Sequence, residues 1–206
     1  MISTALPPSA LQATFASPAM ARLLLFFAVH PDEALHIREL YRRTGLGMAS
    51  LQKELDRFGR LGIIQKHTDG RKVVYRLNPG SERWRAMRTL VRSLAHPSEV
   101  LREAFSGVPG VEAAFVFGSQ ARGDTRPDSD VDLFLIADEA ASRAVQDPIS
   151  EAESLIGRDV DVVTYSSAGV RDRMRAGNAF LDRVSREPKQ WIAGDPQAWS
   201  NLEARA

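Results

Sequence analysis

One stretch near the middle of the chain constrains its fold more than any other. An apolar run ends in Gly118-Ser119, and eleven residues after that serine Asp130 and Asp132 stand within a second apolar run. Successive side chains of a strand point to opposite faces, so carboxylates two residues apart leave from the same face. A divalent cation relieves their mutual repulsion, and hard oxygen ligands suit Mg²⁺ or Mn²⁺. The stretch therefore predicts a sheet in which one strand holds a metal site.

The turn before the aspartates has the chemistry of an anion site. Gly118 lets a phosphate approach the backbone closely, and the amides at the start of a following helix favour negative charge. The hydroxyl of Ser119 adds a donor, although serine is also a common N-cap of a helix. Arg122 suits contact with a phosphate and equally an ion pair with a nearby carboxylate such as Asp124. The residues alone leave both alternatives open.

Strand-like and helix-like segments alternate around this stretch, which is typical of an α/β or α+β sheet with helical cover. Trp191 and Trp199 belong to a tail of low information, where we expect them to make core contacts. The expected strands are 111–117, 131–137 and 159–164, and the expected helices are 118–122, 140–156, 167–175 and 179–186.

Two motifs within this half carry a family resemblance. They read Phe117-Gly118-Ser119-Gln120-Ala121-Arg122-Gly123-Asp124 and Ser129-Asp130-Val131-Asp132-Leu133. Together they resemble the DNA polymerase β-like nucleotidyltransferase superfamily, and within it the minimal nucleotidyltransferase (MNT) group. The resemblance covers about residues 101–164. That group includes antitoxins of HEPN–MNT toxin–antitoxin pairs and proteins fused to helix-turn-helix domains.

The resemblance implies an enzyme that uses Mg²⁺ or Mn²⁺ to transfer a nucleoside monophosphate from a nucleoside triphosphate, with ATP as the expected substrate. The acceptor would be a hydroxyl of a protein, an RNA or a small molecule. Gly118, Ser119 and Arg122 would hold the phosphates. The superfamily has a third carboxylate on a later strand; we expect Asp161, which apolar residues flank, although Asp159 shares its parity. The expected catalytic and metal-binding residues are thus Asp130, Asp132 and Asp161.

The charge of the chain is divided unevenly. Residues 1–97 hold 15 Lys and Arg against 7 Asp and Glu, a net charge of +8, whereas residues 98–206 have a net charge of −7. This polarity favours a polyanion as the partner of the first half and metal cations near the second. Two solvated surfaces that merely differ would look the same, so the charge alone does not decide.

The basic half has the expected order helix, helix, glycine-containing turn, helix and hairpin. Arg71 and Lys72 lie at the tip of that hairpin. Over residues 17–77 this order resembles the winged helix-turn-helix domains of ArsR- and MarR-type bacterial regulators. The expected helices are 19–29, 37–43 and 48–61, and the expected strands are 63–66 and 72–77.

This second resemblance implies that the helix 48–61 enters the major groove of double-stranded DNA while the hairpin touches the adjacent backbone. The positive charge supplies the counterion release on which phosphate contacts depend. Winged helices also serve as protein-interaction modules, and surface cations are commonly just solvated. The expected DNA contacts are Ser50, Gln52, Lys53, Arg57, Arg71 and Lys72.

A helical connector over 81–95 joins the two halves. Its apolar face is too short for a coiled coil, and we expect it to pack against the chain's own core. We therefore expect an α+β chain, with a winged helix-turn-helix domain and connector at 1–97 and a nucleotidyltransferase α/β domain with a small mixed sheet at 98–206. A homodimer would suit paired DNA half-sites. The connector face comprises Trp84, Met87, Val91 and Leu94.

The composition excludes several classes of protein. Because the chain has no cysteine, it has no disulfide scaffold, thiolate zinc site or cysteine nucleophile. The apolar run 23–29 is much shorter than a membrane span, and we expect a cytoplasmic protein with no membrane partner. Two functions remain. One is an enzyme joined to a DNA-binding domain, and the other is a transcription regulator whose second domain senses nucleotide or binds a partner as an antitoxin does.

Overall fold

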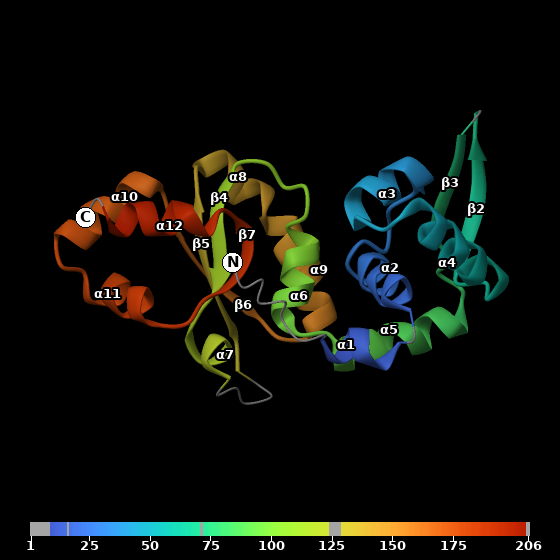
Figure 1. Cartoon of the computed structure of the whole chain (residues 1–206), viewed down its shortest axis with the longest axis horizontal. Coiled ribbons are helices and arrows are strands. Elements are labelled where there is room, and N and C mark those ends of the chain that lie inside the picture. Colours follow the sequence, from blue (N-terminus) through green and yellow to red (C-terminus); the bar gives the residue numbers. More distant parts are fainter. Residues whose placement is uncertain (1–8, 16, 71, 124–128, 205–206) are drawn as a thin grey trace. The chain divides into compact units, whose positions relative to one another are not determined.

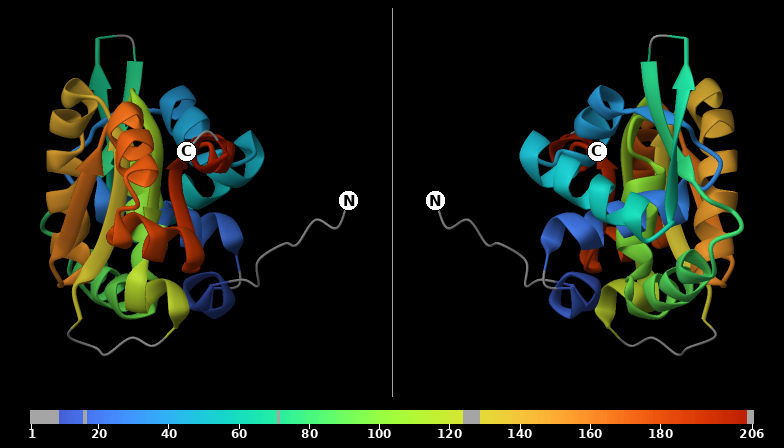
Figure 2. Two further views of the ribbon diagram at one scale, coloured as in Figure 1. Left: turned by 90° about the vertical axis from the view of Figure 1, so that its left-hand side faces the viewer. Right: turned by 90° about the vertical axis from the view of Figure 1, so that its right-hand side faces the viewer.

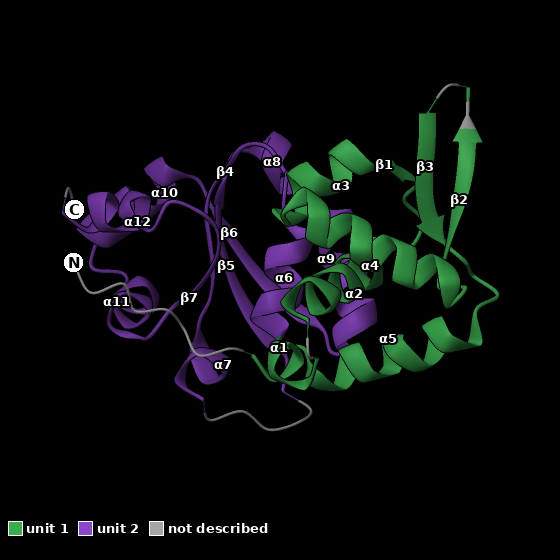
Figure 3. Cartoon of the chain, turned by 45° about the vertical axis from the view of Figure 1, so that its right-hand side comes forward, with its two compact units in different colours: residues 1–96 green, residues 97–206 purple. Residues whose placement is uncertain are grey.

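The computed structural model describes residues 9–15, 17–70, 72–123 and 129–204. The chain divides into two compact units, residues 1–96 and 97–206 (Figure 3). Arg71 and Asp124, to which the sequence assigned contacts, lie outside the described residues. Among the helices of the described ranges, none has the length and apolar character needed to cross a membrane.

Unit 1 (residues 1–96) combines helices with a small antiparallel sheet (Figure 1). The strands of this sheet lie in the order β1-β3-β2, and β2 and β3 form the hairpin that follows α4. The elements are α1 (Ala10–Thr14), α2 (Pro18–Val29), β1 (Leu35–His36), α3 (Ile37–Thr44), α4 (Met48–Arg60), β2 (Ile64–Asp69), β3 (Lys72–Leu77) and α5 (Glu82–Leu94).

Helix α2 forms the centre of unit 1 because most of its residues are apolar and buried. The hydroxyl of Ser17 caps its start by accepting from the amide of Met20 at 3.2 Å. Helix α5 packs against α2, and its Trp84 and Val91 are buried. The apolar face of the connector is therefore used, at least at these two positions, inside the unit.

Unit 2 (residues 97–206) is built on a mixed sheet with the strand order β6-β5-β4-β7. Strands β5 and β6 are parallel, while β4 is antiparallel to both β5 and β7. The strands are β4 (Val111–Val116), β5 (Val131–Ala137), β6 (Val160–Tyr165) and β7 (Gln190–Gly194). The helices are α6 (Pro97–Ala104), α7 (Gly118–Arg122), α8 (Glu139–Ala144), α9 (Gln146–Ile156), α10 (Ser167–Arg175), α11 (Ala179–Arg186) and α12 (Pro196–Glu203).

Helices cover both faces of this sheet: α10, α11 and α12 lie on one side, and α6 and α9 on the other (Figures 1 and 2). The core beneath α10–α12 is rich in aromatic rings, including Phe115, Phe134 and Trp199. Because side chains alternate along a strand, Asp132 shares the face of Phe134, two residues further along β5. The polar start of β5 thus faces the same side as the aromatic core.

One expectation about the second half is wrong in detail. The helix expected over 140–156 is broken into α8 and α9 at Val145. Pro148 explains the break, since its nitrogen has no hydrogen for a carbonyl one turn earlier, whereas a proline is tolerated in a first helical turn. The core contacts expected for the two tryptophans of the tail are confirmed: β7 pairs with β4 and places Trp191 opposite Phe115, and α12 buries Trp199.

Candidate active site

The turn at Gly118 is packed directly against Asp132. Gly118 has a φ of +67°, in the left-handed region that favours glycine. A β-carbon at this position would collide with Oδ2 of Asp132 and lie 3.2 Å from its Cγ. The amide of Phe117 also donates to the backbone oxygen of Asp132 at 3.0 Å. Glycine is therefore required at position 118 for two reasons: the positive φ of the backbone and the close approach of the Asp132 carboxylate.

The parallel pairing of β5 and β6 makes Asp132 and Asp161 register partners. Their side chains lie on neighbouring strands at the same level, where like charges repel. Burial raises the pKa of Asp132 above its ordinary value, and the charges of Asp161 and Asp130 raise it further. Asp130 is exposed and directly precedes β5. The three expected aspartates thus lie near one another at the start of these strands.

The alternative residue Asp159 has a different place. It is exposed and lies one residue before β6, and its backbone oxygen accepts from the amide of Val131 at 3.0 Å. It is not among the charges that raise the pKa of Asp132, whereas Asp161 heads them. Of the two residues that the sequence left open, Asp161 is the one that interacts with Asp132.

The three aspartates, Asp130, Asp132 and Asp161, have the donor atoms that a hard divalent cation prefers. Its ligands would be carboxylate oxygens, and the repulsion between Asp132 and Asp161 is what a bound cation would relieve. Within the described part of the chain, no three side chains of aspartate, glutamate or histidine are grouped closely enough to hold a metal ion. Asp130, Asp132 and Asp161 therefore supply the carboxylate oxygens that such a cation prefers, and Asp132 and Asp161 are paired across neighbouring strands.

Helix α7 carries the other residues expected to bind nucleotide. It has no side-chain cap, and its N-cap residue is Phe117, so Ser119 does not act as the cap. Arg122 donates to Glu187 with 2.8 Å between Nη1 and Oε1. The sequence had suggested a phosphate or Asp124 as the partner of this arginine, and did not anticipate a glutamate 65 positions along the chain.

Other residues near the site were missed from the sequence. Arg183 of α11 lies close enough to lower the pKa of Asp132, and its guanidinium carbon is 5.5 Å from the centre of the Phe180 ring. Glu187 acts on Asp132 in the opposite direction. Both residues belong to the segment after β6, and only their long-range packing brings them to the aspartates. No local pattern in the sequence marks them.

Unit 1 carries the other candidate surface, on α4 and the hairpin. Ser50, Gln52 and Lys53 are exposed on α4, and Lys72 is exposed at the start of β3. Arg57, the other expected contact on α4, is half-exposed, and its Nη1 donates to Oε2 of the buried Glu54 at 3.2 Å.

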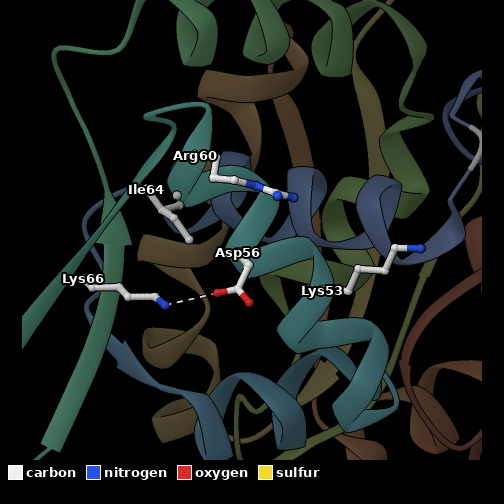
Figure 4. Close-up of a pocket in the computed structure, with 6 residues that line it drawn as sticks. Lys53, Asp56, Arg60, Ile64 and Lys66 are labelled. Atoms are coloured by element: carbon white, nitrogen blue, oxygen red, sulfur yellow. Dashed lines mark hydrogen bonds and ion pairs between the residues drawn. The ribbon is translucent and has the colours of Figure 1, made fainter.

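A groove of about 630 Å³ runs between α4 and β2 (Figure 4). Three cations line it, and one of them is partly neutralised because Nζ of Lys66 lies 3.1 Å from Oδ1 of Asp56. Lys53 is the residue that the groove shares with the expected DNA contacts. The lining comprises Lys53, Asp56, Gly59, Arg60, Ile64 and Lys66.

Comparison with known proteins gives a family match that lies within unit 2. Residues 99–180 match the family described as Polymerase beta, Nucleotidyltransferase. A solved structure described as the crystal structure of the toxin-antitoxin with AMP-PNP is similar at 16% sequence identity and a TM-score of 0.35, covering 54% of this chain and 83% of that one. No curated protein matches the chain.

Proposed function

We propose that unit 2 is a Mg²⁺- or Mn²⁺-dependent nucleotidyltransferase that uses ATP, and that unit 1 directs it to double-stranded DNA. The observation that carries the enzymatic part is the contact of Gly118 with Asp132. It joins a turn suited to phosphate and a carboxylate suited to a metal ion in one piece of structure. The nucleotidyltransferase family match over residues 99–180 supports the same conclusion.

In this proposal Asp130, Asp132 and Asp161 would hold the divalent ion, which when bound would supply positive charge to offset that of the triphosphate. The backbone amides after Gly118 and the hydroxyl of Ser119 orient the phosphates. The acceptor hydroxyl oxygen bonds to the α-phosphorus as the bond to the pyrophosphate oxygen breaks. Asp161 accepts the hydroxyl proton, and pyrophosphate leaves.

Arg122 would turn from Glu187 to the leaving phosphates when nucleotide binds. Its guanidinium is partly exposed in its pair with Glu187, which leaves it accessible to a phosphate. The acceptor hydroxyl belongs to a protein, an RNA or a small molecule that the chain itself does not identify.

For unit 1, the order of helices and hairpin and the exposed side chains of α4 support a winged helix that binds DNA. Ser50, Gln52 and Lys53 would face the major groove, and Lys72 would contact phosphate beside it. The net charge of +8 over residues 1–97 supports a polyanionic partner. A two-fold homodimer would match paired half-sites.

Label transfer tests the enzymatic part. The protein is incubated with ATP labelled at the α-phosphate, Mg²⁺ and cell lysate, and the protein and RNA fractions are examined for label. We expect a labelled acceptor with the wild-type chain and none with the Asp130→Ala/Asp132→Ala double variant. Asp172→Ala, at an exposed residue of helix α10, serves as the control and should keep the transfer.

Label transfer that survives in the double variant would contradict the assigned site. If no label or pyrophosphate appears while ATP changes the affinity for DNA, unit 2 is a nucleotide sensor and not an enzyme. A small helical protein that co-purifies with the chain would instead indicate an antitoxin-like role.

A further inference from the structure

Helix α7 cannot hold its own position. It spans only Gly118–Arg122, and helices this short are unstable without tertiary contacts. Yet it carries the residues that the proposed function assigns to phosphate. Its side chain Gln120 is only 3% exposed, so contacts to the rest of unit 2 fix the helix at that residue.

Arg158 makes the principal polar contact to Gln120. A guanidinium has donors only, so the amide of Gln120 is oriented with its oxygen toward Arg158. In that orientation the oxygen accepts from Nη1 at 2.6 Å and from Nη2 at 2.8 Å. On the far side of α7, Nε2 of Gln190 donates to the backbone oxygen of Gln120 at 3.2 Å.

The same guanidinium reaches the segment that carries the aspartates. Nη1 of Arg158 donates to the backbone oxygen of Ser129 at 3.1 Å. Ser129 directly precedes Asp130, and Asp159, next to Arg158, accepts from Val131. Arg158 therefore bridges the phosphate turn and the start of the Asp130–Asp132 pair, 38 and 29 positions away respectively.

We propose that Arg158 is a positioning residue that sets the distance between the phosphate turn and the metal-binding aspartates. This inference rests on the function proposed above. It depends on the planar fork of arginine, because Nη1 serves Gln120 and Ser129 while Nη2 makes a second bond to Gln120, a two-nitrogen contact that the single ammonium of a lysine cannot reproduce. Arg158 would not touch the nucleotide, and it would matter most when metal and triphosphate must be bound together.

The test measures binding of an ATP analogue with a fluorescent group on its ribose, once with excess Mg²⁺ and once with EDTA. For Arg158→Lys we expect at least about a tenfold loss of affinity with Mg²⁺, which is the usual effect of removing a residue that orients metal ligands. With EDTA the change should stay within about twofold. Arg143→Lys, at an exposed arginine paired with Glu139, is the control and should bind as the wild type does.

A second variant, Gln120→Leu, guards against a purely structural explanation. It removes the oxygen that accepts from Arg158 and preserves the size of the side chain. If Arg158 acts through Gln120, the Arg158→Lys/Gln120→Leu double variant should lose hardly more Mg²⁺-dependent affinity than either single variant. Hydrogen exchange should rise at residues 117–123 and at 129–132 in each variant, while the thermal midpoint changes little.

Three results would overturn the inference. Intact Mg²⁺-dependent binding by Arg158→Lys would overturn it and leave the proposed function standing. Equal losses with Mg²⁺ and with EDTA, together with a lowered thermal midpoint, would make Arg158 a residue of general stability. No nucleotide binding by the wild-type chain would overturn the proposed function itself, and this inference with it.

Discussion

The two units place their functional residues in opposite ways. In unit 1 the expected contacts Gln52, Lys53 and Lys72 are exposed, and each points into solvent from its own position. In unit 2 the site is interlocked, because Asp132 lies over Gly118 and is the register partner of Asp161. Residues in mutual contact show strong non-additivity, whereas separated ones add. We therefore expect large, coupled effects in unit 2 and small, independent ones in unit 1.

The largest effect is expected for Gly118→Ala. The new β-carbon would displace the carboxylate of Asp132 and would also hold alanine at a φ of +67°. Binding of Mg²⁺-ATP should fall by at least about 100-fold, because the phosphate turn and the metal ligand are disturbed together. Fluorescence titration with an ATP analogue measures this loss.

Gly177→Ala is the matched control for that prediction. Gly177 has a φ of +69°, but its β-carbon would meet no atom within 4 Å. It should cost about 1 kcal/mol of unfolding free energy for the backbone angle and leave nucleotide binding unchanged. If Gly118→Ala also leaves nucleotide binding unchanged, the contact between Gly118 and Asp132 does not contribute to that binding.

The next effect is expected for Asp132→Asn, and it separates function from stability. The pKa of Asp132 is raised by burial and by Asp161, so its ionised form is disfavoured in the folded chain. Neutralising it should raise the thermal midpoint slightly, while Mg²⁺-dependent binding falls by roughly 100-fold. Differential scanning fluorimetry and nucleotide titration measure the two. Asp159→Asn should change neither, and a drop in midpoint for Asp132→Asn would contradict the repulsion argument.

These expectations depend on how far the sequence predicted the site. The Gly118-Ser119 turn and the two aspartates were predictable because strand alternation and glycine chemistry are local. For the third carboxylate, strand alternation in the sequence allowed both Asp159 and Asp161, because residues two apart share a face. The register of β5 and β6 then distinguished them by pairing Asp161 with Asp132.

The supports of the site were not predictable in the same way. Arg158 and Glu187 reach their partners across 29 and 65 positions, and a lone charged residue carries no sign of such a contact. Likewise the sequence predicted a DNA contact for Arg57 and did not show that this residue also pairs with the buried Glu54. Strand β7 was missed because an edge strand of five residues has little alternation to read.

Unit 1 also contains a buried histidine, His30, and it qualifies the comparison. Burial, together with the charge of Arg43, lowers the pKa of His30 to about 4, although Nδ1 lies 3.3 Å from Oε1 of Glu33. The histidine is thus neutral in the folded chain and takes up a proton on unfolding at moderately acidic pH. The stability is full above pH 6.5 and is lost as the pH falls from there toward 4.

This loss should amount to roughly 3 kcal/mol of unfolding free energy for unit 1. Chemical denaturation followed across that pH range measures it, and His30→Gln should flatten the dependence because it removes the titrating group. An equal pH dependence in wild type and His30→Gln would assign the effect to other residues of the unit.

The smallest effects are expected for the exposed cations of unit 1, and their additivity is the sharpest check of the comparison. Lys53→Ala and Lys72→Ala should each weaken binding to a duplex of arbitrary sequence by a few fold at about 150 mM salt, and each should reduce the salt slope by about 0.9. The double variant should show the sum, because Lys53 lies on helix α4 and Lys72 on strand β3. Fluorescence anisotropy of labelled DNA over a salt series measures both quantities.

Lys66→Ala is the matched control, since Asp56 already offsets that charge, and it should reduce the slope less. A double variant that loses far more than the sum would mean that the two lysines act on a shared, ordered contact. Unit 1 would then be interlocked in the way that unit 2 is.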